Sequence, residues 1–129
     1  MKYVYPVIFY KDEKKIGVTV PDIFGCHTFG KNMAEAIEMA QDVIEMMLVS
    51  YENDNQEIPQ ASDIDSIKKD SDTIAVSLVV ADTDKWRQEN DNKAVKKTLS
   101  IPSWMNKKAE AKGINFSQCL QDALRAQFE

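Results

Sequence analysis

The first third of the chain alternates between short apolar segments and polar turns. Residues 3–10 are aromatic and β-branched, a composition that favours a strand. Residues 11–14 are polar and predict a turn, and in residues 16–20 every second position is apolar, which predicts a second, half-buried strand paired with the first. Pro21 ends that strand because proline cannot donate to a ladder, and residues 25–29 predict a third, short strand.

A helical repeat follows these strands. Asn32, with Glu35 three residues later, is a helix-start signal because the Asn32 side chain can cap free backbone N–H groups. Apolar residues then recur at helical spacing, with acidic and amide side chains mostly between them, and predict one amphipathic helix of about five turns. These apolar positions are Met33, Ala36, Ile37, Ala40, Val43, Ile44, Met47, Leu48 and Tyr51.

The pattern then returns to that of a strand. Residues 52–72 are polar and acidic and predict a loop, whereas residues 74–80 again alternate and predict a fourth strand. The front of the chain therefore has the order β-β-β-α-β, an α+β unit in which a helix packs on a sheet. We expect one domain over residues 1–81 and a linker over residues 82–93, with a helical turn around Trp86.

Residues 94–129 predict a strand followed by two helices. Residues 95–101 alternate, so that Leu99 and Ile101 face one side and Lys96, Thr98 and Ser100 face the other. A helix is expected over residues 103–112, because Pro102 suits a first helical turn and Gly113 suits a C-cap. Asn115 can cap a second helix, whose apolar face comprises Phe116, Cys119, Leu120, Ala123 and Leu124.

The small size of this C-terminal segment indicates dimerisation. A unit below about 40 residues rarely folds alone without a disulfide or metal. A lone strand exposes unpaired backbone groups, and pairing it with the same strand of a second chain gives a ribbon that buries Leu99 and Ile101. We expect at least a homodimer, or a tetramer if the front domains also pair.

Such a ribbon fits the major groove of DNA. Its outer face would carry Lys96, Thr98 and Ser100, whose side chains can contact base edges. The start of the second helix, at Asn115, Phe116 and Ser117, offers backbone N–H groups that suit a phosphate. We therefore predict base contacts from the first three residues and phosphate contacts from the second three.

The charge distribution supports two different partners. Residues 93–129 hold seven basic and three acidic side chains, whereas residues 1–92 hold nine basic and eighteen acidic ones. A basic unit suits a polyanion, and an acidic unit suits a basic protein.

Candidate catalytic and metal-binding groups are few. The only histidine is His27, and Cys26 and Cys119 show no metal-ligand spacing, so we expect free thiols, no metal, no cofactor and no enzymatic activity. No apolar run is long enough to span a membrane, and the N-terminus lacks the features of a signal peptide, so we expect a cytoplasmic protein without a membrane partner.

Two resemblances sharpen this interpretation. The tail, from Lys96 through Pro102, Gly113 and Asn115 to Leu120, resembles ribbon-helix-helix repressors, although Lys97 stands where the class usually has an apolar residue. The front unit resembles HicB-type antitoxins in the motif Pro21-Asp22-Ile23-Phe24-Gly25-Cys26, in Thr28 and Gly30, in the helix start Ala34-Glu35-Ala36, in Ala40 and in Ile58-Pro59.

The resemblance to HicB-type antitoxins implies both a fold and a function. It implies a partial ribonuclease-H-like front domain without nuclease activity, which binds and blocks HicA, a small basic toxin that cuts mRNA. It also implies that the tail represses the shared operon by binding operator DNA. The toxin-contacting residues are not assigned. Two alternatives stay open at this point: a stand-alone transcription factor whose front domain binds a ligand or protein, and an enzyme on a ribonuclease-H-like core.

Overall fold

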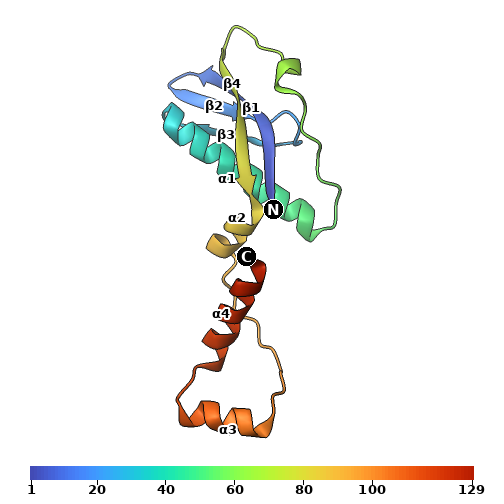
Figure 1. The fold of residues 1–129 in the computed structure, drawn as a ribbon. Coiled ribbons are helices and arrows are strands. Elements are labelled where there is room, and N and C mark those ends of the chain that lie inside the picture. Colours follow the sequence, from blue (N-terminus) through green and yellow to red (C-terminus); the bar gives the residue numbers. More distant parts are fainter. The chain divides into compact units, whose positions relative to one another are not determined.

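The computed structural model describes residues 1–129, which divide into two compact units, residues 1–93 and residues 94–129. Figure 1 labels the elements of both units along the chain. None of the helices is both long and apolar enough to cross a membrane.

The first unit is a sheet with one long helix packed on it (Figure 1). Its order of strands and long helix agrees with the sequence prediction, and the sheet is antiparallel with the strand order β3-β2-β1-β4. The elements are β1 (Lys2–Asp12), β2 (Lys15–Thr19), β3 (His27–Gly30), α1 (Met33–Asn53), the 3₁₀ turn η1 (Ile64–Ser66), β4 (Thr73–Asp82) and α2 (Thr83–Asn90).

The core lies between α1 and one face of the sheet. Alternate residues of β1 point toward the helix, and Tyr5, Val7 and Phe9 are at most 1% exposed. Burial of a large apolar side chain stabilises by roughly 1.5–3 kcal/mol, so this face provides much of the stability of the unit. The other buried apolar residues are Val18, Val20, Ile23, Cys26, Ala36, Ala40, Ile44, Leu48, Val49, Val79 and Ala81.

Glycine at position 30 lets the start of α1 approach the sheet. A Cβ atom on Gly30 would lie 2.4 Å from the backbone nitrogen of Ala36, too close for any side chain. The helix begins just after this contact, where the Asn32 side chain accepts a hydrogen bond of 2.9 Å from the Glu35 backbone N–H, as the sequence predicts.

A proline occupies an inner strand without breaking the sheet. Proline is normally confined to edge strands because it lacks the N–H that a ladder needs, yet Pro6 lies in β1 between β2 and β4. The pairing of β1 with β2 ends at Ile8 and Thr19, while Pro6 lies opposite Leu78 of β4. Because β2 has no residue opposite Pro6, no donor is missing on that side.

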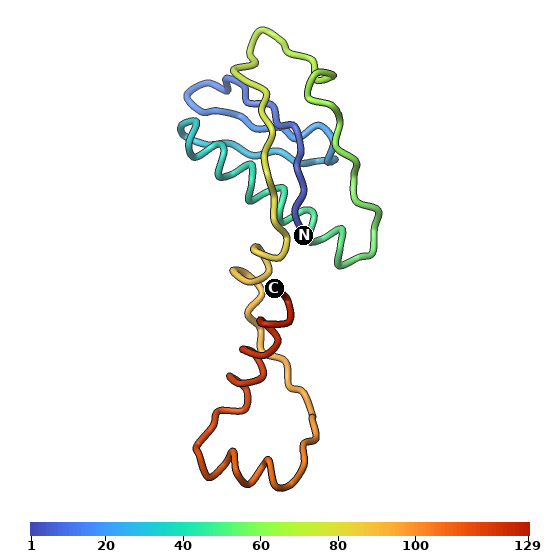
Figure 2. Tube along the Cα trace, in the orientation of Figure 1, coloured from blue at the N-terminus to red at the C-terminus, as the bar shows by residue number.

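The connection from α1 to β4 is long but fixed at several points. The tube in Figure 2 shows it (green) leaving α1 and returning to the sheet. The hydroxyl of Tyr5 donates to the carbonyl oxygen of Pro59 at 2.5 Å, and both the backbone N–H and the hydroxyl of Ser62 donate to the Asp22 carboxylate. The loop predicted over residues 52–72 therefore exists, but hydrogen bonds tie it to β1 and to the β2–β3 connection.

Two elements of the first unit differ from the prediction. Residues 83–90 form the two-turn helix α2, where we expected a linker with a single turn around Trp86. The Asp82 side chain caps this helix by accepting from the backbone N–H groups of Asp84 and Lys85. The third strand also begins at His27 rather than at residue 25, because Gly25 adopts a positive φ of 72° in the preceding turn.

The second unit contains helices α3 (Ser103–Ala111) and α4 (Phe116–Phe128). Gly113 ends the first helix with a φ of 66°, and the Asn115 side chain caps the second by accepting from the Gln118 N–H at 3.1 Å, both as predicted. The strand predicted over residues 95–101 is not formed in the single chain. A strand needs a partner for its backbone groups, and this unit contains no other strand.

Candidate functional site

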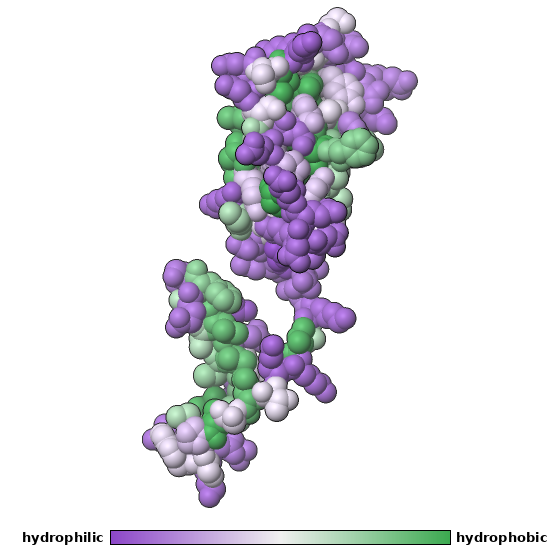
Figure 3. Space-filling model, turned by 90° about the vertical axis from the view of Figure 1, so that its right-hand side faces the viewer, coloured by the Kyte–Doolittle hydropathy of each residue, from purple (hydrophilic) through white to green (hydrophobic).

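The second unit has no buried residue in either of its helices. Its large apolar side chains remain exposed, for example 63% for Trp104 and 79% for Phe128. Figure 3 shows such apolar side chains (green) gathered on the surface of this unit. The exposed apolar residues of the unit are Val95, Leu99, Ile101, Trp104, Met105, Ile114, Phe116, Leu120, Leu124 and Phe128.

The apolar residues of α4 lie on one face of the helix. Phe116, Leu120 and Leu124 follow a four-residue spacing, so their side chains form one stripe. The opposite side is polar, with the Gln118 amide and the Arg125 guanidinium both donating to the Asp122 carboxylate. An amphipathic helix whose apolar stripe is exposed requires another surface, and within residues 94–129 the chain provides none.

The residues predicted to contact DNA are all exposed. Lys96, Thr98 and Ser100 lie in the extended segment before α3, which has no regular structure in the single chain. Asn115, Phe116 and Ser117 lie together at the start of α4, where Asn115 is the cap and the other two are the first helical residues. The second group is therefore brought together by one helix end, whereas the first lies in a segment without regular structure.

In the first unit, ionic and hydrogen bonds fix α2 against α1. The Arg87 guanidinium donates to a Glu52 carboxylate oxygen at 2.7 Å and to the Asn53 side-chain oxygen at 2.8 Å. The Tyr3 hydroxyl donates to the other Glu52 oxygen at 2.8 Å, and the Thr83 hydroxyl does so at 3.3 Å. Desolvation alone would raise the pKa of Glu52, but the hydrogen bonds from Arg87, Tyr3 and Thr83 outweigh it and lower that pKa.

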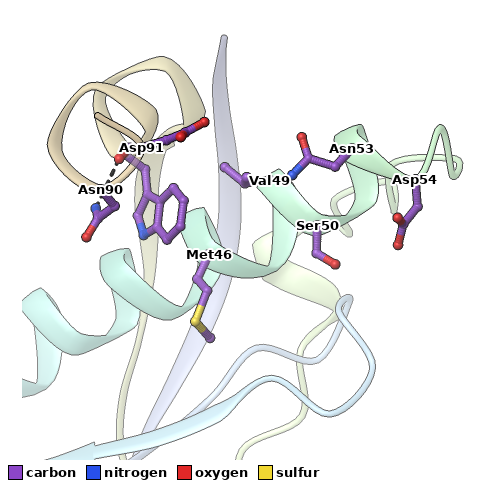
Figure 4. Close-up of a pocket in the computed structure, with 8 residues that line it drawn as sticks. Met46, Val49, Ser50, Asn53, Asp54, Asn90 and Asp91 are labelled. Atoms are coloured by element: carbon purple, nitrogen blue, oxygen red, sulfur yellow. Dashed lines mark hydrogen bonds between the residues drawn. The ribbon is translucent and has the colours of Figure 1, made fainter. Parts of the chain in front are cut away.

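A shallow hollow lies between α1 and α2 (Figure 4), with a volume of about 390 Å³. Met46, Val49 and Asn53 lie on its α1 side, and Asn90 and Asp91 lie across from them. A second hollow of about 500 Å³ shares Met46 and Asn90 and extends toward Thr28. No histidine or cysteine lines either hollow.

The two cysteines and the single histidine lie in different environments. Cys26 is buried, and desolvation raises the pKa of its thiol to about 11, so the thiol is protonated and unreactive at neutral pH. Cys119 is also free but lies exposed on α4. His27 is exposed, with its Nδ1 atom 3.2 Å from the Thr19 hydroxyl oxygen. The structure brings together no group of three or more His, Cys, Asp or Glu side chains that could hold a metal ion.

Comparison with known proteins identifies the family. Residues 5–123 match the model of the HicB-like antitoxins of bacterial toxin–antitoxin systems. The chain belongs to this family. The matched range includes the whole sheet unit from Tyr5 onward and most of the second unit.

Solved structures agree with this assignment. A chain of a toxin–antitoxin complex from Streptococcus pneumoniae is 28% identical, with a TM-score of 0.64 over 98% of this chain and 99% of that one. The antitoxin HicB of Burkholderia pseudomallei shares the fold at 21% identity, with a TM-score of 0.51 over 95% of this chain and 96% of that one. No curated protein sequence gives a significant match.

Sequence reasoning missed one set of residues in this antitoxin. Glu45 was placed on the polar side of the helix, yet it is only 3% exposed and its carboxylate accepts a 2.7 Å hydrogen bond from the Asp82 backbone N–H. Gln41 lies one turn earlier and donates to the Val80 carbonyl oxygen at 2.8 Å. The helical spacing of Gln41 and Glu45 was visible in the sequence, but the strand edge beside them was not.

Proposed function

We propose that this antitoxin neutralises a small basic HicA-type toxin that cuts mRNA, and that as a dimer it represses its own operon by binding operator DNA. It acts by binding and carries out no catalysis. Residues 1–81, within the first unit, form a partial ribonuclease-H-like domain that binds the toxin, and residues 94–129 form a ribbon-helix-helix dimer.

The observation that carries the DNA-binding half of this proposal is the exposed apolar surface of α3 and α4. A second copy of the same segment is the simplest partner, because its stripe is identical and a two-fold axis can bring the two together. Pairing of residues 95–101 with the same residues of the second copy would satisfy their backbone groups and bury Leu99 and Ile101. It would leave Lys96, Thr98 and Ser100 of both chains on the outer face, toward the major groove.

The charge distribution supports both halves. Residues 93–129 carry an excess of basic side chains, which suits the DNA backbone. Residues 1–92 carry twice as many acidic as basic side chains, which suits a basic toxin. The similar chain from S. pneumoniae belongs to a toxin–antitoxin complex, in keeping with a toxin partner.

A gel-shift assay with the promoter DNA of the operon tests the DNA-binding half. The combined variant Lys96→Ala, Thr98→Ala and Ser100→Ala should abolish operator binding, while the toxin still copurifies. Lys68→Ala with Ser71→Ala removes a comparable lysine and hydroxyl from the first unit, and should leave operator binding intact. Operator affinity that survives the triple substitution contradicts the ribbon assignment.

Coexpression with the small basic protein encoded in the adjacent reading frame tests the toxin-binding half. The antitoxin should copurify with that protein and suppress its cleavage of mRNA. Deletion of residues 94–129 should remove DNA binding. Absence of any complex with the full-length chain would favour a stand-alone regulator instead.

A further inference from the structure

The outer edge of β4 is open along part of its length. In the order β3-β2-β1-β4, β4 pairs only with β1, so its other side has no strand partner. Natural sheets usually protect such edges with charged residues, prolines or bulges. The register of β4 against β1 shifts at Ile74, so a bulge protects the start of the strand. From Val76 to Ala81 the strand contains no charged residue, no proline and no register shift, so this part does not discourage another strand from pairing.

The helix α1 covers only the end of this edge. Gln41 donates to the carbonyl oxygen of Val80, and Glu45 accepts from the N–H of Asp82, so these two backbone groups point away from β1. Successive residues of a strand direct their N–H and C=O groups to alternate sides. Val76 and Leu78 therefore point the same way as Val80, and no side chain of α1 bonds to them.

The position of Pro6 agrees with this assignment. Pro6 lies opposite Leu78, and it has no N–H to donate. If Leu78 directed its backbone groups toward β1, its carbonyl oxygen would face Pro6, which has no N–H to donate, and one hydrogen bond of the Pro6–Leu78 pair would be missing. With Leu78 directed outward, the Pro6–Leu78 pair needs no hydrogen bond, so the register and the edge assignment are consistent.

An apolar surface borders the open edge. On the face of the sheet away from α1, Leu78 is 53% exposed, Val80 48% and the neighbouring Val4 44%. A strand added at β4 would extend this face and could place alternate apolar side chains against it. The edge thus offers both backbone hydrogen bonds and apolar contacts.

The charges around the edge determine which partner fits. Asp70 and Asp72 precede the strand, next to Lys68 and Lys69, and Asp82 and Asp84 at its other end both lie within salt-bridge distance of the N-terminal ammonium. The excess of negative charge belongs to the unit as a whole, because residues 1–92 hold eighteen acidic and nine basic side chains. Glu38 lies on α1 one turn before Gln41 and is exposed. A second copy of this unit would bring like charges together, whereas a basic protein would meet opposite charges.

We propose that a strand of the basic toxin pairs with β4 at Val76 and Leu78. This proposal rests on the proposed function and specifies where the toxin binds. The backbone of β4 supplies the hydrogen bonds, and the net negative charge of the first unit attracts the basic partner.

The substitution Leu78→Pro in the full-length antitoxin tests the proposal. An outward N–H forms no bond within the sheet, so proline is tolerated there better than at an inward position. The substitution removes one N–H donor from the open edge and places the proline ring where the added strand would pair. Affinity for the small basic protein of the adjacent reading frame should fall roughly 30-fold or more, as at an interface hot spot. Phe29→Pro, at an outward and similarly exposed position of the opposite edge strand β3, is the matched control and should leave the affinity unchanged.

Amide exchange measured by NMR on the wild-type chain gives an independent result. The amides of Val76 and Leu78 should exchange fast in the free antitoxin and become protected in the complex, while the inward amide of Ser77 stays protected in both. Equal affinity of a folded Leu78→Pro variant, or no new protection at Val76 and Leu78 in a complex that does form, overturns the proposal alone. A fall in the mass of the free antitoxin caused by Leu78→Pro shows that a second copy occupies the edge, and also overturns it. Failure of the wild-type chain to bind the toxin overturns the proposed function as well.

Discussion

The two units differ in how far they bury their apolar side chains within one chain. In the first, Tyr5 and Phe9 are 1% exposed and Ile44 is fully buried, all within one chain. In the second, Leu120 and Leu124 remain 37% and 44% exposed. The first unit therefore carries its own core, whereas the helices of the second bury no residue within one chain. We expect the stability of the second unit alone to depend on protein concentration.

The two tryptophans separate the units experimentally. Trp86 lies in α2 of the first unit and Trp104 lies in α3 of the second. A Trp104→Phe background reports on the first unit by fluorescence, and a Trp86→Phe background reports on the second.

The largest effect is expected from Leu124→Asp on the apolar stripe of α4. A charge at this position would have to be buried in the dimer, so we predict complete loss of dimerisation and of operator binding. Light scattering measures the mass, and Trp104 fluorescence reports the loss of packing. Gln121→Asp places the same charge off the stripe and should leave the dimer intact. A dimeric Leu124→Asp variant would show that this stripe is not the interface.

Leu48→Ala should affect only the first unit. Leu48 is fully buried between α1 and the sheet, and truncation of a buried leucine costs about 2–5 kcal/mol because a cavity remains. Urea unfolding followed through Trp86 should show this loss, while the Trp104 transition keeps its midpoint. A matched shift of both transitions would mean that the units unfold together.

Glu52→Gln should weaken the attachment of α2 at neutral pH. The Arg87–Glu52 bond is only partly buried, so we expect a loss of roughly 1–2 kcal/mol. The pKa of Glu52 is lowered in the folded chain, so its carboxylate stabilises the fold above the ordinary glutamate pKa, and this contribution disappears as pH falls through the lowered value. Unfolding of wild type and variant, followed through Trp86, should therefore converge in acid. A difference that persists at the lowest pH would contradict the role of the carboxylate.

The smallest effect is expected from Asn115→Ala, which removes the cap of α4. Loss of an N-cap costs about 1 kcal/mol, seen through Trp104 in the dimer, whereas Asn115→Asp retains a capping oxygen and should behave as wild type. Equal stability of the alanine variant would indicate that the dimer partner, rather than the cap, fixes this end of the helix.

Local signals made much of the fold predictable. The caps at Asn32 and Asn115 and the stop at Gly113 were recognised because each depends on residues within one turn. The burial of Glu45 could not be recognised from the sequence, because its hydrogen-bond partner is the backbone N–H of Asp82, 37 residues away. Helix α2 was assigned largely to a linker because its contacts with Glu52 and Asn53 lie on another element.

The candidate DNA interface could be predicted only in part, for a physical reason. Asn115, Phe116 and Ser117 are brought together by one helix end, so one chain is sufficient to arrange them. Lys96, Thr98 and Ser100 alternate along a segment that has no regular structure in the single chain. In the proposed dimer their arrangement would depend on the second chain, so the periodicity of the sequence can indicate it without fixing it.

The pairing of β1 with β4 has a consequence for protein synthesis. The first strand of the sheet needs a partner that ends at Asp82, so the sheet is completed only after that residue leaves the ribosome. At a synthesis rate of ~5–20 residues per second, the remaining segment follows within seconds. The unit proposed to bind the toxin can then fold while translation continues, whereas the unit proposed to bind DNA must first dimerise with a second complete chain. At a low concentration of antitoxin, toxin binding would therefore precede repression of the operon.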